Sequence, residues 1–313
     1  MDRLNNDAPL PDRLRAGVIA LGNFDGFHRG HQAVVARARD HARAGGRPLI
    51  IATFDPHPVR FFHPEAAPFR LTTLDQRARL FAAAGADAML VFRFDAELAG
   101  ESAADFVTER IARRTGAAAL VTGEDFTFGR GRSGNVAVLA ELGARHGIAT
   151  EAVAPVTDAN GSISSSRIRD ALKLGDCDTA TRLLTRPFAI EGPVIHGDRL
   201  GRELGFPTAN LDMADYLRPA YGIYAVRGRL PDGRVVGGAA NLGIRPSFDP
   251  PKELLEPYFF DFSGDLYGRA VEVALISFIR PERRFGTLDA LRAQIDEDCA
   301  EAARRLAVAP AVA

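Results

Sequence analysis

The sequence predicts an α/β protein of two domains: a parallel sheet covered by helices, then an antiparallel β-barrel that ends in a helix. Three observations support this prediction. The chain has 313 residues, more than one hydrophobic core usually serves. Up to about residue 154, short apolar runs alternate with segments of helical period. Beyond residue 187, this alternation is replaced by short β-rich runs that Gly and Pro separate.

The first domain is expected over residues 1–186. Strand–helix alternation is typical of a parallel sheet with helices on both faces, and ligands bind such sheets at the carboxyl ends of the strands. The first sixteen residues carry no sustained apolar run and are expected to be a frayed terminus. The expected strands are Gly17–Leu21, Leu49–Thr53, Ala88–Phe92, Ala118–Thr122 and Ile148–Val153. The expected helices are Gln32–Arg43, Leu74–Ala84, Ala103–Arg114, Asn135–His146, Ser165–Leu174 and Thr179–Leu184.

The second domain is expected over residues 187–313. Several short strands with turn residues between them are typical of an antiparallel barrel or sandwich. Asp232-Gly233 indicates a tight hairpin, and Thr287 begins a final helix with an apolar stripe. The expected strands are Phe188–Val194, Gly222–Leu230, Val235–Asn241, Tyr258–Phe262 and Val271–Ile279.

Composition narrows the class of protein. Hydrophobic residues make up 46% of the chain and charged residues 25%, as in ordinary globular proteins. Lys plus Arg (39) nearly balance Asp plus Glu (40), which argues against a protein that coats nucleic acid or an anionic membrane. No signal peptide and no membrane-spanning run is recognisable. We therefore expect a cytoplasmic protein with neither nucleic acid nor membrane as its partner.

The loop after the first strand has the chemistry of a phosphate site. It reads Gly22-Asn23-Phe24-Asp25-Gly26-Phe27-His28-Arg29-Gly30-His31 and leads directly into a helix. Gly30 is expected to open that helix, where unpaired amides and the positive end of the dipole favour phosphate. His28 and His31 flank it and can donate hydrogen bonds to phosphate oxygens as pyrophosphate leaves.

Two further segments fit the same site. Thr53-Phe54-Asp55-Pro56-His57-Pro58 follows the second strand and would lie on the same edge of the sheet. Ile163-Ser164-Ser165-Ser166-Arg167-Ile168-Arg169 combines hydroxyls at a helix start with arginines, which suits a triphosphate. Taken singly, the first also fits a rigid loop and the second an N-capped surface helix.

Together these segments carry a family resemblance. His28-Arg29-Gly30-His31 resembles the HxGH motif of the Rossmann-like nucleotidylyltransferases. In order along the chain, GNFDGxHRGHQ, TFDPHP, GEDFTFG (residues 123–129) and SSSRIR resemble the adenylyltransferase half of bacterial bifunctional riboflavin kinase/FMN adenylyltransferases. The resemblance implies catalytic His28 and His31. It implies ATP contacts from Gly22, Phe24, Gly30, Ser164, Ser165 and Arg167, and flavin contacts from Asn23, Asp25, Asp55 and Asp125. Arg77 stands where the family often has lysine, and no role is expected of it.

A second site is expected at the start of the barrel. The glycine-rich segment from Gly197 ends in Gly205-Phe206-Pro207-Thr208-Ala209-Asn210, which resembles the PTAN motif of riboflavin kinases. The later NLGIRPSF and DLYG segments are also similar to that family. The resemblance implies phosphate contacts from Gly201, Gly205 and Thr208, and Mg²⁺ held with ATP by Thr208 and Asn210. It also implies that Glu256 is the general base, with Glu253 as the alternative.

The sequence thus predicts an enzyme with two active sites: riboflavin and ATP give FMN, then FMN and ATP give FAD and pyrophosphate. The expected ligands are riboflavin, FMN, FAD and ATP, with Mg²⁺ accompanying ATP. Three alternatives stay open. They are a monofunctional FMN adenylyltransferase with a flavin-binding second domain, a flavin carrier without catalysis, and a nucleotidylyltransferase for another acceptor. The oligomeric state is not predicted.

Overall fold

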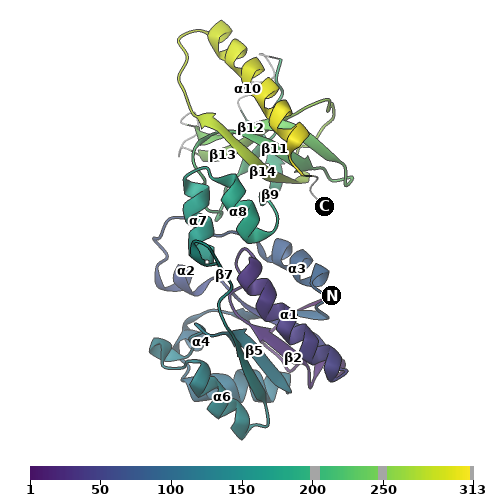
Figure 1. The fold of residues 1–313 in the computed structure, drawn as a ribbon, viewed down its shortest axis with the longest axis vertical. Helices are drawn as coiled ribbons and strands as arrows, with labels where there is room; N and C mark the ends of the chain where they lie inside the picture. The colour runs from purple at the N-terminus through teal and green to yellow at the C-terminus, as the bar shows by residue number, and fades with distance from the viewer. Residues whose placement is uncertain (198–204, 246–251, 311–313) are drawn as a thin grey trace. The chain divides into compact units, whose positions relative to one another are not determined.

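The computed structural model describes residues 1–197, 205–245 and 252–310. These divide into two compact units (Figure 1). The first comprises residues 1–67 and 72–164, and the second comprises residues 68–71 and the chain from Ser165 onward. The segment 165–186, expected in the first domain, therefore groups with the second unit. The boundary at residue 186 stays a prediction for the catalytic domains.

The first unit is built on a six-stranded parallel sheet in the order β1-β4-β3-β2-β5-β6. Each apolar run that was expected to be a strand is one, because runs of four to seven apolar residues suit strands buried on both faces. The strands are β1 (Asp2–Asn5), β2 (Val18–Leu21), β3 (Leu49–Asp55), β4 (Ala88–Arg93), β5 (Ala119–Gly123) and β6 (Ala149–Val153).

The expectation of a frayed N-terminus was wrong. β1 pairs in parallel with β4, with Asp2 opposite Ala88 and Asn5 opposite Val91. Leu4 is the one apolar side chain of this strand, and it packs against the core. Three of the four residues of β1 are polar, so the sequence there contains no apolar run that would predict a strand.

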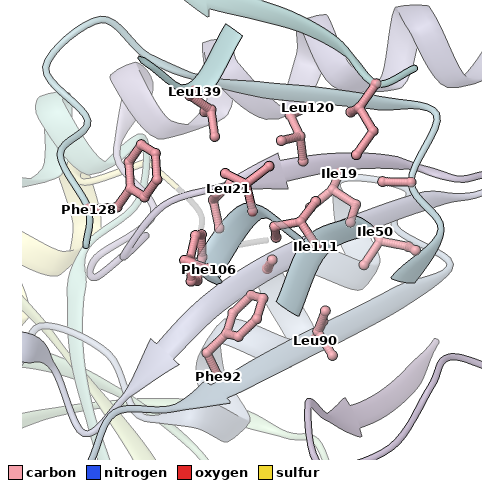
Figure 2. Close-up of a cluster of buried hydrophobic side chains, with 14 of the residues drawn as sticks. Ile19, Leu21, Ile50, Leu90, Phe92, Phe106, Ile111, Leu120, Phe128 and Leu139 are labelled. Carbon is pink, nitrogen blue, oxygen red and sulfur yellow. The ribbon is translucent and has the colours of Figure 1, made fainter. Parts of the chain in front are cut away.

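Helices cover the sheet. Residues alternate between two cores along β2, where Ile19 and Leu21 face one and Val18 and Ala20 face the other. Figure 2 shows the first of these cores, in which strand side chains meet Phe106 and the neighbouring helical residues. The helices are α1 (Arg29–Ala44), α2 (Pro58–Phe62), α3 (Leu74–Ala83), α4 (Ala96–Gly100), α5 (Ala103–Asp105), a π-helical stretch η2 (Phe106–Arg113) and α6 (Val136–Arg145). Short 3₁₀ turns η1 (Asp12–Leu14) and η3 (Arg130–Arg132) and a small hairpin, β7 (Thr157–Asp158) and β8 (Gly161–Ser162), complete the unit.

The strand order identifies where a ligand would bind this sheet. From β2 the chain proceeds to β3 and β4 on one side, and it returns to β5 on the other. The carboxyl ends of β2 and β5 therefore flank the topological switch point, which is the usual ligand site of open α/β sheets. The loops that leave these two ends begin at Gly22 and at Glu124.

The second unit is a closed antiparallel barrel in the order β10-β13-β12-β11-β14-β9. The hairpin at Asp232-Gly233 joins β11 to β12, as expected, with Gly233 at φ +86°. The strand expected at Tyr258–Phe262 was misplaced, since β13 begins at Lys252 and contains Glu256. The strands are β9 (Phe188–Ile195), β10 (Asn210–Asp212), β11 (Gly222–Arg229), β12 (Val235–Arg245), β13 (Lys252–Phe259) and β14 (Ala270–Pro281).

Among the residues of this unit that the structure describes, the helices are α7 (Ser165–Lys173), α8 (Cys177–Leu184) and α10 (Leu288–Val308). α10 lies across the outside of the barrel (Figure 1), where Ala302 packs against Ala225 of β11 and Ala239 of β12. Arg280 of β14 holds the helix through a two-pronged ion pair with the buried Asp298, at 2.8 and 2.6 Å. Within the described residues, no helix combines the length and apolarity needed to span a membrane.

Candidate active sites

The loop between β2 and α1 is held in place by buried side chains beneath it. Arg77 of α3 is only 3% exposed, and its Nη1 donates to the Thr53 hydroxyl at 2.8 Å and to the Asn23 carbonyl at 3.2 Å. The Thr53 hydroxyl donates to the same Asn23 carbonyl at 2.7 Å. Arg77 also lies 3.5 Å from the Asp55 carboxylate. Arg77, which was given no role from the sequence, thus ties Asn23 to Asp55.

Asp25 fastens the same loop to the start of the α3 region. Its carboxylate is buried and accepts hydrogen bonds from the backbone amide of Thr72 at 2.9 Å and from its hydroxyl at 3.2 Å. The Thr72 hydroxyl accepts in turn from the Gly26 amide at 2.9 Å. These contacts give Asp25 a role in shaping the loop, and its contact with flavin stays a prediction.

His28 caps helix α1, which begins at Arg29. Its Nδ1 accepts hydrogen bonds from the amides of Gly30 at 3.1 Å and His31 at 3.3 Å. The expectation that these helix-start amides are unpaired was therefore wrong, because a capping side chain satisfies them. Since Nδ1 is an acceptor, the proton of the neutral ring is on Nε2. His28 can thus donate a hydrogen bond from Nε2.

The spacing of the HxGH motif has a steric reason. The rings of His28 and His31 are stacked with their centroids 3.6 Å apart, and Phe24 meets His31 edge-on at 5.3 Å. A Cβ on Gly30 would lie 3.0 Å from the His28 ring and 3.3 Å from the Ile163 carbonyl. Glycine is therefore the residue that lets the histidine pair and the Ile163–Ser164 segment come together.

The other predicted residues of this site lie at strand ends and at a helix start. Asp55 ends β3, and Asp125 is exposed just after β5. Gly22 lies against the buried ring of Phe24, to which a Cβ would come within 3.1 Å. Ser164 ends the first unit and is half-buried. Ser165 and Arg167 stand on the first turn of α7, in the second unit.

The sequence reasoning missed an aromatic group beside this edge of the sheet. The rings of Phe61, Phe62 and Phe94 lie within 5.2–5.7 Å of one another. Phe62 is 58% exposed although it is large and apolar. Phe61 and Phe62 belong to α2, which directly follows the TFDPHP segment. The two adjacent phenylalanines that follow this motif in the sequence could have indicated an aromatic group at this edge of the sheet.

In the second unit, the PTAN segment leads into β10. Thr208 is half-buried and Asn210 is buried, and the Ala209 amide donates to the Pro257 carbonyl at 2.9 Å. This bond places the segment beside β13. A Cβ on Gly197 would come within 2.7–2.9 Å of the Asn210 carboxamide, so only glycine leaves room for it. Gly205 is exposed at φ +91°, and Gly201 lies outside the described residues.

Glu256 and Glu253 stand in different surroundings. Glu256 of β13 is opposite Asn241 of β12, whose Nδ2 donates to its Oε2 at 3.4 Å. Glu253 binds Arg218 at 2.6 Å through Oε2 and the Tyr221 hydroxyl through Oε1. Burial acts to raise the pKa of Glu253, but the Tyr221 hydrogen bond and Arg218 together hold that pKa below its usual value. Glu253 is thus committed to structural contacts, which leaves Glu256 as the candidate base.

Family comparisons match each half of the chain separately. A family model described as FAD synthetase matches residues 10–167, and one described as riboflavin kinase matches residues 184–306. The chain is 42% identical over 294 residues to the bifunctional riboflavin kinase/FMN adenylyltransferase of Pseudomonas fluorescens, covering 94% of each chain. It is 38% identical over 281 residues to the protein of that name from Escherichia coli K12, covering 90% of each. The chain belongs to this bifunctional family.

One solved structure has a fold similar to that of this chain. It has a TM-score of 0.85 and 29% sequence identity, and the match covers 97% of this chain and 99% of that chain. It is the crystal structure of a protein named as a macrolide-efflux protein from Streptococcus pneumoniae. The fold of two units is therefore shared, and the family assignment rests on the two matched halves and the bifunctional relatives.

Proposed function

We propose that this chain phosphorylates riboflavin to FMN in its second unit and adenylylates FMN to FAD in its first, with ATP as the donor in both steps. The observation that carries the proposal is the bond from the Ala209 amide to the Pro257 carbonyl at 2.9 Å. Pro257 follows Glu256 in β13, so the segment that resembles PTAN and the proposed base belong to neighbouring strands in the half that matches riboflavin kinase. A domain that only bound flavin would need neither, and this argues against the monofunctional alternative.

In the kinase step, Glu256 takes the proton of the riboflavin 5′-hydroxyl as its oxygen bonds to the γ-phosphorus of ATP, and ADP leaves. Thr208 and Asn210 are proposed to hold the Mg²⁺ that accompanies ATP. They fit this ion because they offer neutral oxygen donors, and the carboxamide of Asn210 lies close against Gly197, where a Cβ would displace it. Among the described residues no group of three or more His, Cys, Asp or Glu could hold a metal. When bound, Mg²⁺ would neutralise phosphate charge.

In the adenylyl step, a phosphate oxygen of FMN attacks the α-phosphorus of ATP, and pyrophosphate leaves. The protein has to align the reactants and stabilise the charge of the leaving group. His28 donates from Nε2 because its Nδ1 is committed to the helix cap. His31 lies in the same ring stack, and Ser164, Ser165 and Arg167 stay predicted phosphate contacts. The exposed Phe62 of α2, the helix that follows the TFDPHP segment, offers an apolar ring for the flavin.

The test is a time course with purified full-length protein, riboflavin, ATP and Mg²⁺, with flavins separated by chromatography. The proposal predicts that FMN appears first and then gives way to FAD, and that a chelator in excess over Mg²⁺ stops both. FAD from added FMN without any product from riboflavin would favour the monofunctional alternative. The cytoplasmic location expected from the sequence stays a prediction.

A further inference from the structure

Asn241 has an amide group whose orientation is fixed by two carboxylates. Its Nδ2 lies 3.4 Å from Oε2 of Glu256 and 3.2 Å from Oε1 of Glu282. Ionised carboxylates only accept hydrogen bonds, so the atom between them must be the amide nitrogen. The amide oxygen consequently faces away from both carboxylates.

That amide oxygen is buried and unsatisfied. Oδ1 of Asn241 meets no hydrogen-bond donor in the parts of the chain that the structure describes. Buried polar atoms of native proteins are nearly always paired, because an unpaired acceptor loses its hydration without compensation. A donor on a bound ligand would supply the missing partner.

The surrounding backbone holds this arrangement. A Cβ on Gly243 would lie 2.0 Å from Oε1 of Glu282, so glycine lets the Glu282 carboxylate rest against β12. Ala239, two residues before Asn241, packs against Ala302 of α10. Alternate residues of a strand share one face, so Asn241 is on the outer face of the barrel that α10 partly covers.

We infer that Asn241 recognises riboflavin by accepting a hydrogen bond from a secondary hydroxyl of its ribityl chain. This inference rests on the kinase activity proposed above and identifies the part of the substrate that is read there. Glu256 is the proposed base for the 5′-hydroxyl, and Asn241 is its direct cross-strand neighbour. The secondary hydroxyls adjoin the 5′-carbon, whereas the ring N–H lies at the other end of riboflavin. Asn241 is therefore placed to bind the ribityl chain and not the flavin ring.

The test compares two flavins on full-length wild type and Asn241→Ala. One is riboflavin, and the other carries a plain 5-hydroxypentyl chain on N10, which keeps the reacting hydroxyl and lacks the secondary ones. Because Asn241 also donates to Glu256, both flavins lose some rate, but we expect Asn241→Ala to lower kcat/KM for riboflavin about tenfold more than that for the analogue. Equal losses on both flavins would overturn the inference. Dissociation constants from flavin fluorescence give the same comparison if the analogue turns over too slowly.

A second, more conservative variant, Glu282→Gln, tests the inference even if Asn241→Ala fails to fold. Glu282→Gln keeps the size of the side chain but can also donate to an amide oxygen, so it no longer fixes the orientation of Asn241. It should lower kcat/KM for riboflavin about threefold more than that for the analogue. FAD formation from supplied FMN should be unaffected in both variants. Wild type that phosphorylates neither flavin would instead contradict the proposed kinase function.

Discussion

Arg77 donates a hydrogen bond to the backbone carbonyl of Asn23 at 3.2 Å from a position that is 3% exposed. The contact joins α3 to the loop after β2, which is the part of the first unit that carries the HxGH histidines. A buried cation in this place also lies 3.5 Å from the Asp55 carboxylate. We therefore propose Arg77 as a positioning residue of the predicted adenylyltransferase site.

Replacing Arg77 by methionine should lower kcat/KM for FAD formation from FMN by roughly tenfold to a hundredfold, the usual loss for a charged hydrogen bond. Arg77→Lys should lose less, because it keeps the charge and one donor. FMN formation from riboflavin by the same proteins is the control. If Arg77→Met kept full FAD formation, or if both activities fell together, the positioning role would be wrong.

Glu256 and Glu253 provide a matched pair in the kinase unit. Glu256→Gln should reduce FMN formation by roughly 10²–10⁴-fold, the range for loss of a general base. Glu253→Gln should keep FMN formation within a few-fold and lower the unfolding temperature, because it removes the ion pair with Arg218 and leaves one oxygen to accept from Arg218 or Tyr221. Initial rates and calorimetry separate the two effects. The reverse pattern would move the base to Glu253.

Gly197 tests the packing around Asn210. In Gly197→Ala the new Cβ would lie within 2.7–2.9 Å of the carboxamide, so Asn210 has to move. We expect FMN formation to fall by about tenfold or more, as for a misplaced binding group. Gly192→Ala is the control, since a Cβ there meets nothing within 4 Å. Similar rates for both variants would show that Asn210 does not need its present position.

Glu151 of β6 gives a pH prediction. The hydrogen bond from Arg37 at 2.5 Å, and then that from His41, hold the pKa of Glu151 below its usual value. A lowered pKa in the folded state stabilises the protein above the unfolded pKa of about 4.3, and this stabilisation is lost as pH falls through the folded pKa. Glu151→Gln should cost about 0.5–1 kcal/mol at pH 7.

The loss of stability caused by Glu151→Gln should shrink as the pH is lowered from about 4.3 toward the lower folded pKa, because the unfolded wild-type chain takes up its proton first and the folded carboxylate is protonated last. Calorimetric unfolding temperatures between pH 7 and pH 3.5 measure this trend. Glu141→Gln is the control, because Glu141 forms an exposed pair with Arg145 within one helix. If the difference in unfolding temperature between wild type and Glu151→Gln grew toward low pH, the pKa of Glu151 would not be lowered in the folded state.

The parts of the structure that the sequence predicts are those with local causes. Buried strands such as β3 can be predicted because they are continuous apolar runs in the sequence. The loop through His28 can be predicted because it joins such a strand to a helix. β1 escaped notice because its stability comes from pairing with β4, far along the chain. The cap made by His28 was also not predicted, since histidine is not among the favoured capping residues.

Residues whose roles depend on tertiary contacts could not be assigned from sequence. In the sequence Arg77 is indistinguishable from an ordinary helical arginine. Its role becomes visible only in the folded structure, where it donates to the Asn23 carbonyl. Asn241 and Glu282 are 41 positions apart and meet only because of how the chain leaves β14. The choice between Glu256 and Glu253 was drawn from family resemblance, and the contacts of Glu253 with Arg218 and Tyr221 now support it physically.

The most direct test of two separate sites uses His28→Ala in the full-length protein with riboflavin, ATP and Mg²⁺. His28 caps α1 and supplies the proposed phosphate donor, and both contributions belong to the first unit. The account predicts that FMN accumulates at close to the wild-type rate, while FAD formation falls by roughly a hundredfold or more, as for loss of a positioned donor. Loss of both products in a protein that still unfolds cooperatively, or unchanged FAD formation, would contradict it.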